Sequence, residues 1–191
     1  MEIPGRYSTS CKSKKAGTGS SARIAGKNMA ESFGNRNFWP SGTAGVFGVP
    51  PEPTHLSFSR DIVHCHPYLR IRWPELLRLY QEKTGNDLII TCTWRSVREQ
   101  QRLFRQGRVA DGPIVTNIDG RDRKSNHNIY PARALDVAVN RNTDEKKVRI
   151  TWEVEYYEPL LDICKSLDLV SGGSWQNFLD WPHAEITQGI E

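Results

Sequence analysis

An aspartate in the middle of an apolar segment constrains the fold of this chain more than any other feature. The segment, residues 134–139, reads Ala-Leu-Asp-Val-Ala-Val and alternates as a β-strand. Alternation predicts that Leu135, Val137 and Val139 face one side of a sheet, while Asp136 faces the other between two alanines. A buried carboxylate is costly unless it is paired, hydrogen-bonded or bound to a metal. We therefore expect either a functional site at Asp136 or a sheet face that is open to solvent.

A stretch near the C-terminus, residues 180–185, places two carboxylates and an imidazole close together. Pro182 biases the preceding residue away from helix, so we expect a loop that runs into a short strand. In extended chain His183 and Glu185 project from the same face, and Asp180 lies on the approach to it. The pattern is typical either of a solvated turn or of a histidine metal ligand with a nearby carboxylate that handles protons.

Arg95 lies between a predicted buried strand, residues 87–93, and a predicted helix that ends near Gln106. Ser96 is the expected N-cap of that helix, and Glu99 three residues later completes a capping box. Functional side chains are often placed at such junctions, although a surface arginine is the alternative reading.

Two further helices are expected. The first spans about 74–84, with Pro74 in its first turn. The second spans about 153–168, or starts near Glu158 because Pro159 fits a helix start better than a helix interior.

The four cysteines, at positions 11, 65, 92 and 164, are widely scattered. No Cys-X-X-Cys pair is present, so neither a zinc–thiolate site nor a disulfide framework is indicated. Cys92 and Cys164 lie in apolar segments, which predicts buried free thiols. The residues of His64-Cys65-His66 are consecutive and poorly spaced for chelation, so we do not interpret them as a metal site.

Residues 1–60 carry the excess of positive charge, with eight Lys and Arg against three Asp and Glu, in a chain of net charge +4. Gly, Ser, Lys and Asn dominate this region, and it has no helical or strand periodicity. We therefore expect a basic, low-complexity extension at 1–60 and one domain at 61–191. The extension is either a disordered tail or an arm that docks on an anionic polymer, a nucleic acid or a structural partner protein.

Two histidines and the strand aspartate form a candidate metal set: His127, Asp136 and His183. Two imidazoles and one carboxylate suit Zn²⁺, with a fourth position left for water. Zinc lowers the pKa of water to about 7, which makes a nucleophile at neutral pH. Asp180 would take the proton and pass it to a leaving amine. Arg95 would face the developing oxyanion.

Several motifs occur in one order over about residues 68–186 and resemble the zinc D-alanyl-D-alanine peptidase superfamily. The branch they resemble is the L-alanyl-D-glutamate endopeptidases of phage endolysins and bacterial wall hydrolases. The matching pieces are Thr93-Trp94-Arg95-Ser96, Ser125-Asn126-His127-Asn128, Ala134-Leu135-Asp136, and Gly172-Gly173-Ser174-Trp175 followed by Asp180 and Pro182-His183.

The resemblance implies a site and a reaction. Zinc would be held by His127, Asp136 and His183, with Asp180 as general base and acid and Arg95 stabilising the transition state. The substrate would be the peptidoglycan stem peptide, cut at its L-Ala–D-Glu bond. The implied fold is of the α+β class: a small, mainly antiparallel sheet with helices packed on it.

The first ten residues lack the apolar segment of a signal peptide, and no apolar run approaches the roughly 20 residues of a membrane span. We therefore expect a protein made in the cytoplasm that reaches the cell wall after release or as part of a phage particle. A phage lysin fits this expectation.

The chain departs from the family pattern between its first two ligands. His127 and Asp136 are nine residues apart instead of the usual seven, and Pro131 stands where a glycine is common. Two extra loop residues cost little closure entropy, so the ligands should still converge. The longer loop can reshape the substrate cleft, so the sequence does not decide which peptide bond is cut.

Three other functions remain as alternatives. The first is a D-alanyl-D-alanine carboxypeptidase or dipeptidase with the same metal set. The second is a non-catalytic structural or binding protein on a peptidase scaffold. The third is nucleic-acid binding through the basic arm, which would depend steeply on salt.

Overall fold

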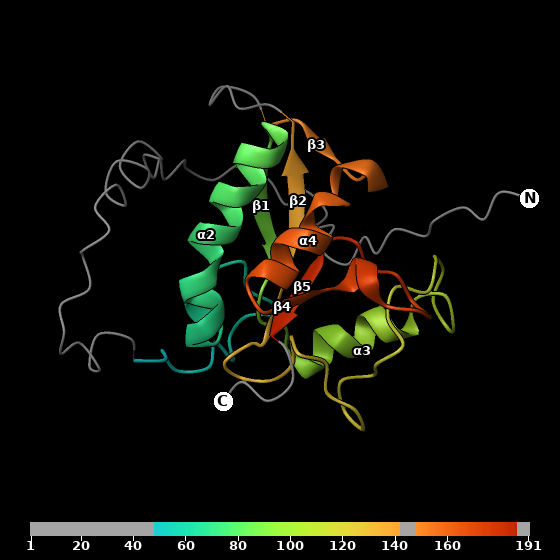
Figure 1. Cartoon of the computed structure of the whole chain (residues 1–191). Helices are drawn as coiled ribbons and strands as arrows, with labels where there is room; N and C mark the ends of the chain where they lie inside the picture. The colour runs from blue at the N-terminus through green and yellow to red at the C-terminus, as the bar shows by residue number, and fades with distance from the viewer. Residues whose placement is uncertain (1–47, 142–147, 187–191) are drawn as a thin grey trace, which may run out of the picture. The chain divides into compact units, whose positions relative to one another are not determined.

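The computed structural model describes residues 48–141 and 148–186 (Figure 1). Residues 1–47 of the predicted extension, with Cys11, lie outside these ranges. In the described ranges no helix is long and apolar enough to cross a membrane. The elements are η1 (Ile62–His64), α2 (Pro67–Thr84), β1 (Asp87–Cys92), α3 (Val97–Arg105), β2 (Ala134–Asn140), β3 (Ile150–Thr151), η2 (Val154–Tyr156), α4 (Pro159–Ser166), β4 (Leu169–Ser171), η3 (Gly172–Ser174) and β5 (His183–Ile186).

The strands form one sheet in the order β1-β2-β5-β4, and β3 pairs with the far end of β2. Every pairing between these strands is antiparallel. The predicted α+β class with a small, mainly antiparallel sheet is therefore confirmed. Strand β2 is central, and each of its residues is buried.

The apolar core lies between the sheet and the helices α2 and α4, which Figure 1 shows side by side over it. Strand β2 contributes Leu135, Val137 and Val139 to this core, as the alternation predicted. The pleat then directs Asp136 to the opposite face. On that face Arg95 connects α3 to β2. Its guanidinium donates hydrogen bonds to Gln100 of α3 and to Asp136 of β2. The helix residues of the core include Leu69, Leu76, Tyr80, Leu160, Ile163 and Cys164.

The helices confirm two of the predicted starts and correct a third. Ser96 caps α3 through a hydrogen bond from Glu99 N to its Oγ at 3.2 Å, and α4 begins at Pro159. The prediction that the first long helix starts at Pro74 is wrong, because α2 begins at Pro67 and contains Pro74 in its interior. A proline in a helix interior removes one hydrogen bond, and burial of Leu69 and other residues on the core face compensates for that loss.

Residues upstream of the domain boundary predicted at 61 pair with the chain beside Arg95. Ser59 N donates to Trp94 O at 2.7 Å, and Thr93 N donates to Ser59 O at 2.8 Å. Ser96 N donates to Ser57 O at 2.9 Å. The compact unit that carries the candidate site includes the chain from Val49 onward. This short segment therefore helps to fix the end of β1.

A close approach of η3 to the loop before β5 generates a first prediction. Asp180 N donates to Gly172 O at 3.1 Å, and a Cβ on Gly172 would lie 2.9 Å from His183 Cβ and collide with Asp180 O. We expect Gly172→Ala to lower the free energy of unfolding by about 1–3 kcal/mol, as overpacking does. Urea denaturation measures this change. Gly48→Ala is the control, because a Cβ there meets nothing within 4 Å; equal stability of the two variants would contradict the prediction.

Candidate active site

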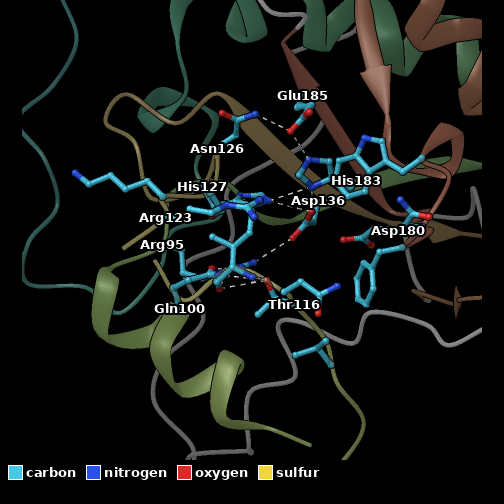
Figure 2. A pocket seen from close by; sticks show the side chains of 18 of the residues that line it. Arg95, Gln100, Thr116, Arg123, Asn126, His127, Asp136, Asp180, His183 and Glu185 are labelled. Atoms are coloured by element: carbon cyan, nitrogen blue, oxygen red, sulfur yellow. Dashed lines mark hydrogen bonds and ion pairs between the residues drawn. The ribbon is translucent and has the colours of Figure 1, made fainter. Parts of the chain in front are cut away.

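Three side chains from three segments meet at one point on the face of the sheet opposite the core (Figure 2). Asp136 lies on β2, His183 opens β5, and the two residues are paired in the antiparallel register. His127 comes from the loop that precedes β2, where its backbone oxygen accepts a hydrogen bond from Arg95 N at 2.9 Å. The exposed fractions of Asp136, His127 and His183 are 4%, 3% and 5%, so water has little access to any of them.

The donor atoms of this trio form a nearly equilateral triangle. Asp136 Oδ1 lies 3.2 Å from His127 Nε2 and 3.0 Å from His183 Nδ1, and the two imidazole nitrogens are 3.3 Å apart. Ligands of a tetrahedral zinc with bonds of about 2.0–2.1 Å stand about 3.3 Å from one another. The spacing therefore fits a zinc ion that binds all three, and the two extra residues between His127 and Asp136 do not separate the donors.

The outer nitrogens of both imidazoles are held by acceptors, which fixes the ring orientations. His127 Nδ1 donates to the backbone oxygen of Thr93 at 2.6 Å. His183 Nε2 donates to Glu185 Oε2 at 3.0 Å, and Asn126 Nδ2 donates to the same carboxylate at 2.7 Å. The inner nitrogens are therefore left to face Asp136 with their lone pairs, as in metal sites whose histidines are oriented by carbonyl or carboxylate groups.

Three converging lone pairs require positive charge, which either a metal or protons can supply. Burial disfavours a charged imidazole, but the Asp136 carboxylate outweighs this effect and raises the pKa of His127 to about 9. For His183, Asp136 and Glu185 together overcome burial and raise the pKa to about 10. A metal at this site would therefore have to displace protons.

Asp180 lies beside the trio without being hydrogen-bonded to it through its side chain. Its carboxylate comes within 4.8 Å of the donor atoms of Asp136 and His183. Burial, followed by the negative charge of Asp136, raises the pKa of the Asp180 carboxyl to about 7. A carboxyl with a pKa near neutrality can both accept and return a proton, although a bound dication would lower that pKa.

Arg95 is buried against the metal set, so its alternative reading as a surface arginine is wrong. Its exposed fraction is 4%, and its Nη2 donates to Asp136 Oδ2 at 3.3 Å. Its Nη1 donates to Gln100 Oε1 at 2.8 Å. Gln100 in turn donates from Nε2 to Ile118 O at 2.8 Å. This chain of contacts orients the Asp136 carboxylate and places a positive charge next to it.

Cys92 is a residue of this site whose position the sequence reasoning missed. It is a buried free thiol, as predicted, but the β1–β2 register sets it opposite Asp136. Its Sγ accepts a hydrogen bond from Arg95 Nη2 at 3.4 Å and lies within 4.8 Å of the donors of His127 and Asp136. Cys92 is therefore a fourth potential donor. By contrast, no metal-binding group in the described residues includes the His64-Cys65-His66 run.

A pocket of about 680 Å³ opens on this centre. The Trp175 ring forms one wall and lies 4.8 Å from the His183 ring, and Phe178 also lines the space. Asn117 and Arg123 line it as well, together with the five predicted site residues. A pocket of this size can hold a ligand in contact with the donor trio.

Comparisons with known proteins found a curated relative and a solved structure that resemble the chain. No family model matches the chain. The chain is 31% identical over 130 residues to the peptidoglycan L-alanyl-D-glutamate endopeptidase CwlK of Bacillus subtilis, a match that covers 63% of this chain and 72% of CwlK. The crystal structure of the L-Ala D-Glu endopeptidase ChiX of Serratia marcescens matches 65% of this chain and 81% of its own at 22% identity and a TM-score of 0.46.

The match to CwlK places the chain among the peptidoglycan peptidases. The match covers 72% of CwlK, which is enough to assign the family. The chain belongs to the family of L-alanyl-D-glutamate endopeptidases that includes CwlK, which confirms the resemblance seen in its motifs.

The role of Glu185 in orienting His183 gives a second prediction. Glu185→Gln removes the charge that accepts from His183 Nε2, so we expect a 10–100-fold loss of zinc affinity, as for other groups that hold a metal ligand. Competition with a chromophoric chelator measures the affinity. Glu155→Gln, at an exposed carboxylate on η2, serves as the control and should leave it unchanged. Equal affinities of the two variants would show that Glu185 does not support the ligand.

The raised pKa values of the two histidines give a third prediction. Between pH 6 and 8 the imidazoles of His127 and His183 would hold protons that zinc must displace, so the zinc affinity should rise with pH. Calorimetry of zinc binding in buffers of different ionisation enthalpy counts the released protons, and we expect about two per zinc. An affinity that is independent of pH in this range would contradict the assignment of these residues.

Proposed function

We propose that the protein is a zinc-dependent peptidoglycan endopeptidase that hydrolyses the L-Ala–D-Glu bond of the stem peptide. The single observation that carries the proposal is the convergence of His127, Asp136 and His183, with donor atoms 3.0–3.3 Å apart, beside Asp180. Membership of the family that includes CwlK supports the substrate and the bond.

Each ligand has a partner that prepares it for the metal. Thr93 O and Glu185 fix the two imidazoles, while Arg95 holds the second oxygen of Asp136. Zinc, when bound, would supply Lewis acidity, which acidifies water and polarises the scissile carbonyl. The chain itself therefore contributes a rigid, desolvated donor set that needs little rearrangement during the reaction.

Asp180 carries out the proton transfers. It takes the proton of the attacking water and later delivers it to the nitrogen of the leaving D-Glu residue, so the carboxylate is regenerated at the end of each cycle. Its backbone supports this role, because Asp180 N is anchored on Gly172 O and His183 N donates to Asp180 O at 3.0 Å. The proton acceptor is thus held at a fixed distance from the third ligand.

Arg95 acts on the transition state through its charge. The guanidinium is buried and lines the pocket beside Asp136, where a low local dielectric strengthens its attraction for a developing oxyanion. Its hydrogen bond to Gln100 prevents it from swinging away from the centre. We propose further that the enzyme works on bacterial walls as a phage lysin.

The general-base role generates a fourth prediction. Asp180→Asn should reduce kcat by about 10²–10⁴-fold, because the amide cannot accept the proton of the attacking water. Zinc content should stay at the wild-type level, since Asp180 is not needed to complete the ligand trio. Asp162→Asn, at an exposed carboxylate of α4, is the matched control. Peptide cleavage followed by chromatography measures kcat, and full activity of Asp180→Asn would remove the proposed base.

The identity of the products tests the bond assignment directly. Zinc-loaded protein incubated with muropeptides should release fragments that begin with D-Glu, and chelation should stop their release. Mass spectrometry detects them. Loss of a single terminal D-Ala would favour a carboxypeptidase instead, and the absence of any cleavage would favour a non-catalytic wall-binding protein.

A further inference from the structure

Three lysine and arginine side chains line the pocket, and they differ in whether they already make hydrogen bonds or ion pairs within the protein. Arg95 is buried and donates to Asp136, Gln100 and Cys92. Arg123 and Lys124 also line the pocket, and both side chains are exposed to solvent. The residues that the structure describes give neither side chain a hydrogen bond or an ion pair. These two cations are therefore available to a ligand, whereas Arg95 is committed to the metal set.

The backbone that presents Arg123 is fixed by its own turn. Asp119 Oδ1 accepts hydrogen bonds from the backbone nitrogens of Arg121 and Arg123, both at 3.1 Å, and Gly120 N donates to Arg123 O at 2.9 Å. These amide contacts lower the pKa of Asp119, so the carboxylate stays ionised. The turn is thus a preorganised support for Arg123, in contrast to a freely moving loop tip.

The same turn is packed against the residue that holds Arg95. Gly120 has φ +78°, and a Cβ at this position would lie 2.6 Å from Gln100 Cγ, so only glycine fits so close to α3. Downstream of Arg123 the loop is tied to the centre through Asn126, which donates to Glu185, and then through His127 (Figure 2). Both ends of the segment that carries Arg123 and Lys124 are therefore fixed relative to the donor trio.

The charges of the pocket indicate what these cations bind. Its acidic side chains, Asp136, Asp180 and Glu185, gather at the metal centre, and the uncommitted charges on its wall are positive. In the stem peptide the D-Glu residue is joined onward through its side-chain carboxyl, so its α-carboxylate is free. That carboxylate is attached to the carbon that bears the scissile nitrogen. It must therefore lie close to the donor trio whenever the bond is in place for hydrolysis.

We propose that Arg123, assisted by Lys124, binds the free α-carboxylate of the D-Glu residue and selects for an acidic residue after the cleaved bond. This inference rests on the proposed function. A guanidinium matches a carboxylate with two parallel hydrogen bonds, which fixes the orientation of the residue as well as its charge. Arg123 is thus a specificity-determining residue, and amidation of this carboxylate would weaken cleavage.

Two synthetic peptides test the proposal: L-Ala-γ-D-Glu-L-Lys-D-Ala and the same peptide with the α-carboxylate converted to the carboxamide. Wild-type protein should cleave the acid with a kcat/KM at least about tenfold above that of the amide, the scale of one charge-assisted hydrogen bond. Arg123→Gln should remove most of this preference, mainly by raising KM for the acid. Arg123→Lys should restore part of it, and Arg123→Gln combined with Lys124→Gln should abolish the preference.

Arg121→Gln is the matched control, because Arg121 is an exposed cation of the same turn that does not line the pocket. It should leave the ratio unchanged. An unchanged ratio in the double variant, with cleavage intact and a wild-type melting temperature, would overturn the proposal.

A measurement of peptide binding distinguishes failure of the proposed function from failure of the carboxylate site. If wild-type protein cleaves neither peptide, that function fails, and calorimetry with the zinc-loaded protein still tests the carboxylate site. Binding of the acid at least about tenfold tighter than the amide, lost in Arg123→Gln, would support the site independently of catalysis. Equal binding of the two peptides would overturn it.

Discussion

The convergence of three lone pairs on one buried point is the constraint on which the rest of the site depends. Asp136 Oδ1, His127 Nε2 and His183 Nδ1 lie within 3.3 Å of one another, and such an arrangement persists only around positive charge. The antiparallel register of β2 and β5 brings two of the three together as cross-strand neighbours. The third, His127, lies on a loop whose backbone accepts a hydrogen bond from Arg95 N.

The surroundings of the trio explain how one small sheet can bear this concentration of polar groups. The remaining polar atoms of the ligands are satisfied by Thr93 O, by Glu185 and by Arg95. Because these partners are themselves buried or held, the site is both desolvated and rigid. The same desolvation raises the pKa of Asp180, so the chemistry and the architecture share one physical cause.

The sequence predicted the features that local pattern determines. Asp136 was identified because a carboxylate breaks the apolar alternation of β2, and Ser96 because capping depends on neighbouring residues. The predicted start of α2 was wrong, because a proline such as Pro74 in a helix interior resembles a helix start when tertiary packing is unknown. Strands β3 and β4, of two and three residues, are too short to show any periodicity.

Features that depend on register or on packing could not be predicted. The placement of Cys92 beside Asp136 follows from the β1–β2 pairing and the irregularity between Ile90 and Cys92. Likewise, nothing in the sequence shows that Arg95 points at Asp136, or that Arg123 and Lys124 are left without partners among the described residues. Pairwise contacts between distant segments decide all three.

The central claim is that His127, Asp136 and His183, and not Cys92, hold the metal. X-ray absorption at the zinc edge of the zinc-loaded protein tests it most directly. The account predicts one zinc per chain surrounded only by nitrogen and oxygen at about 2.0–2.1 Å, with the scattering signature of two imidazoles. A sulfur neighbour at about 2.3 Å, or substoichiometric zinc, would contradict it.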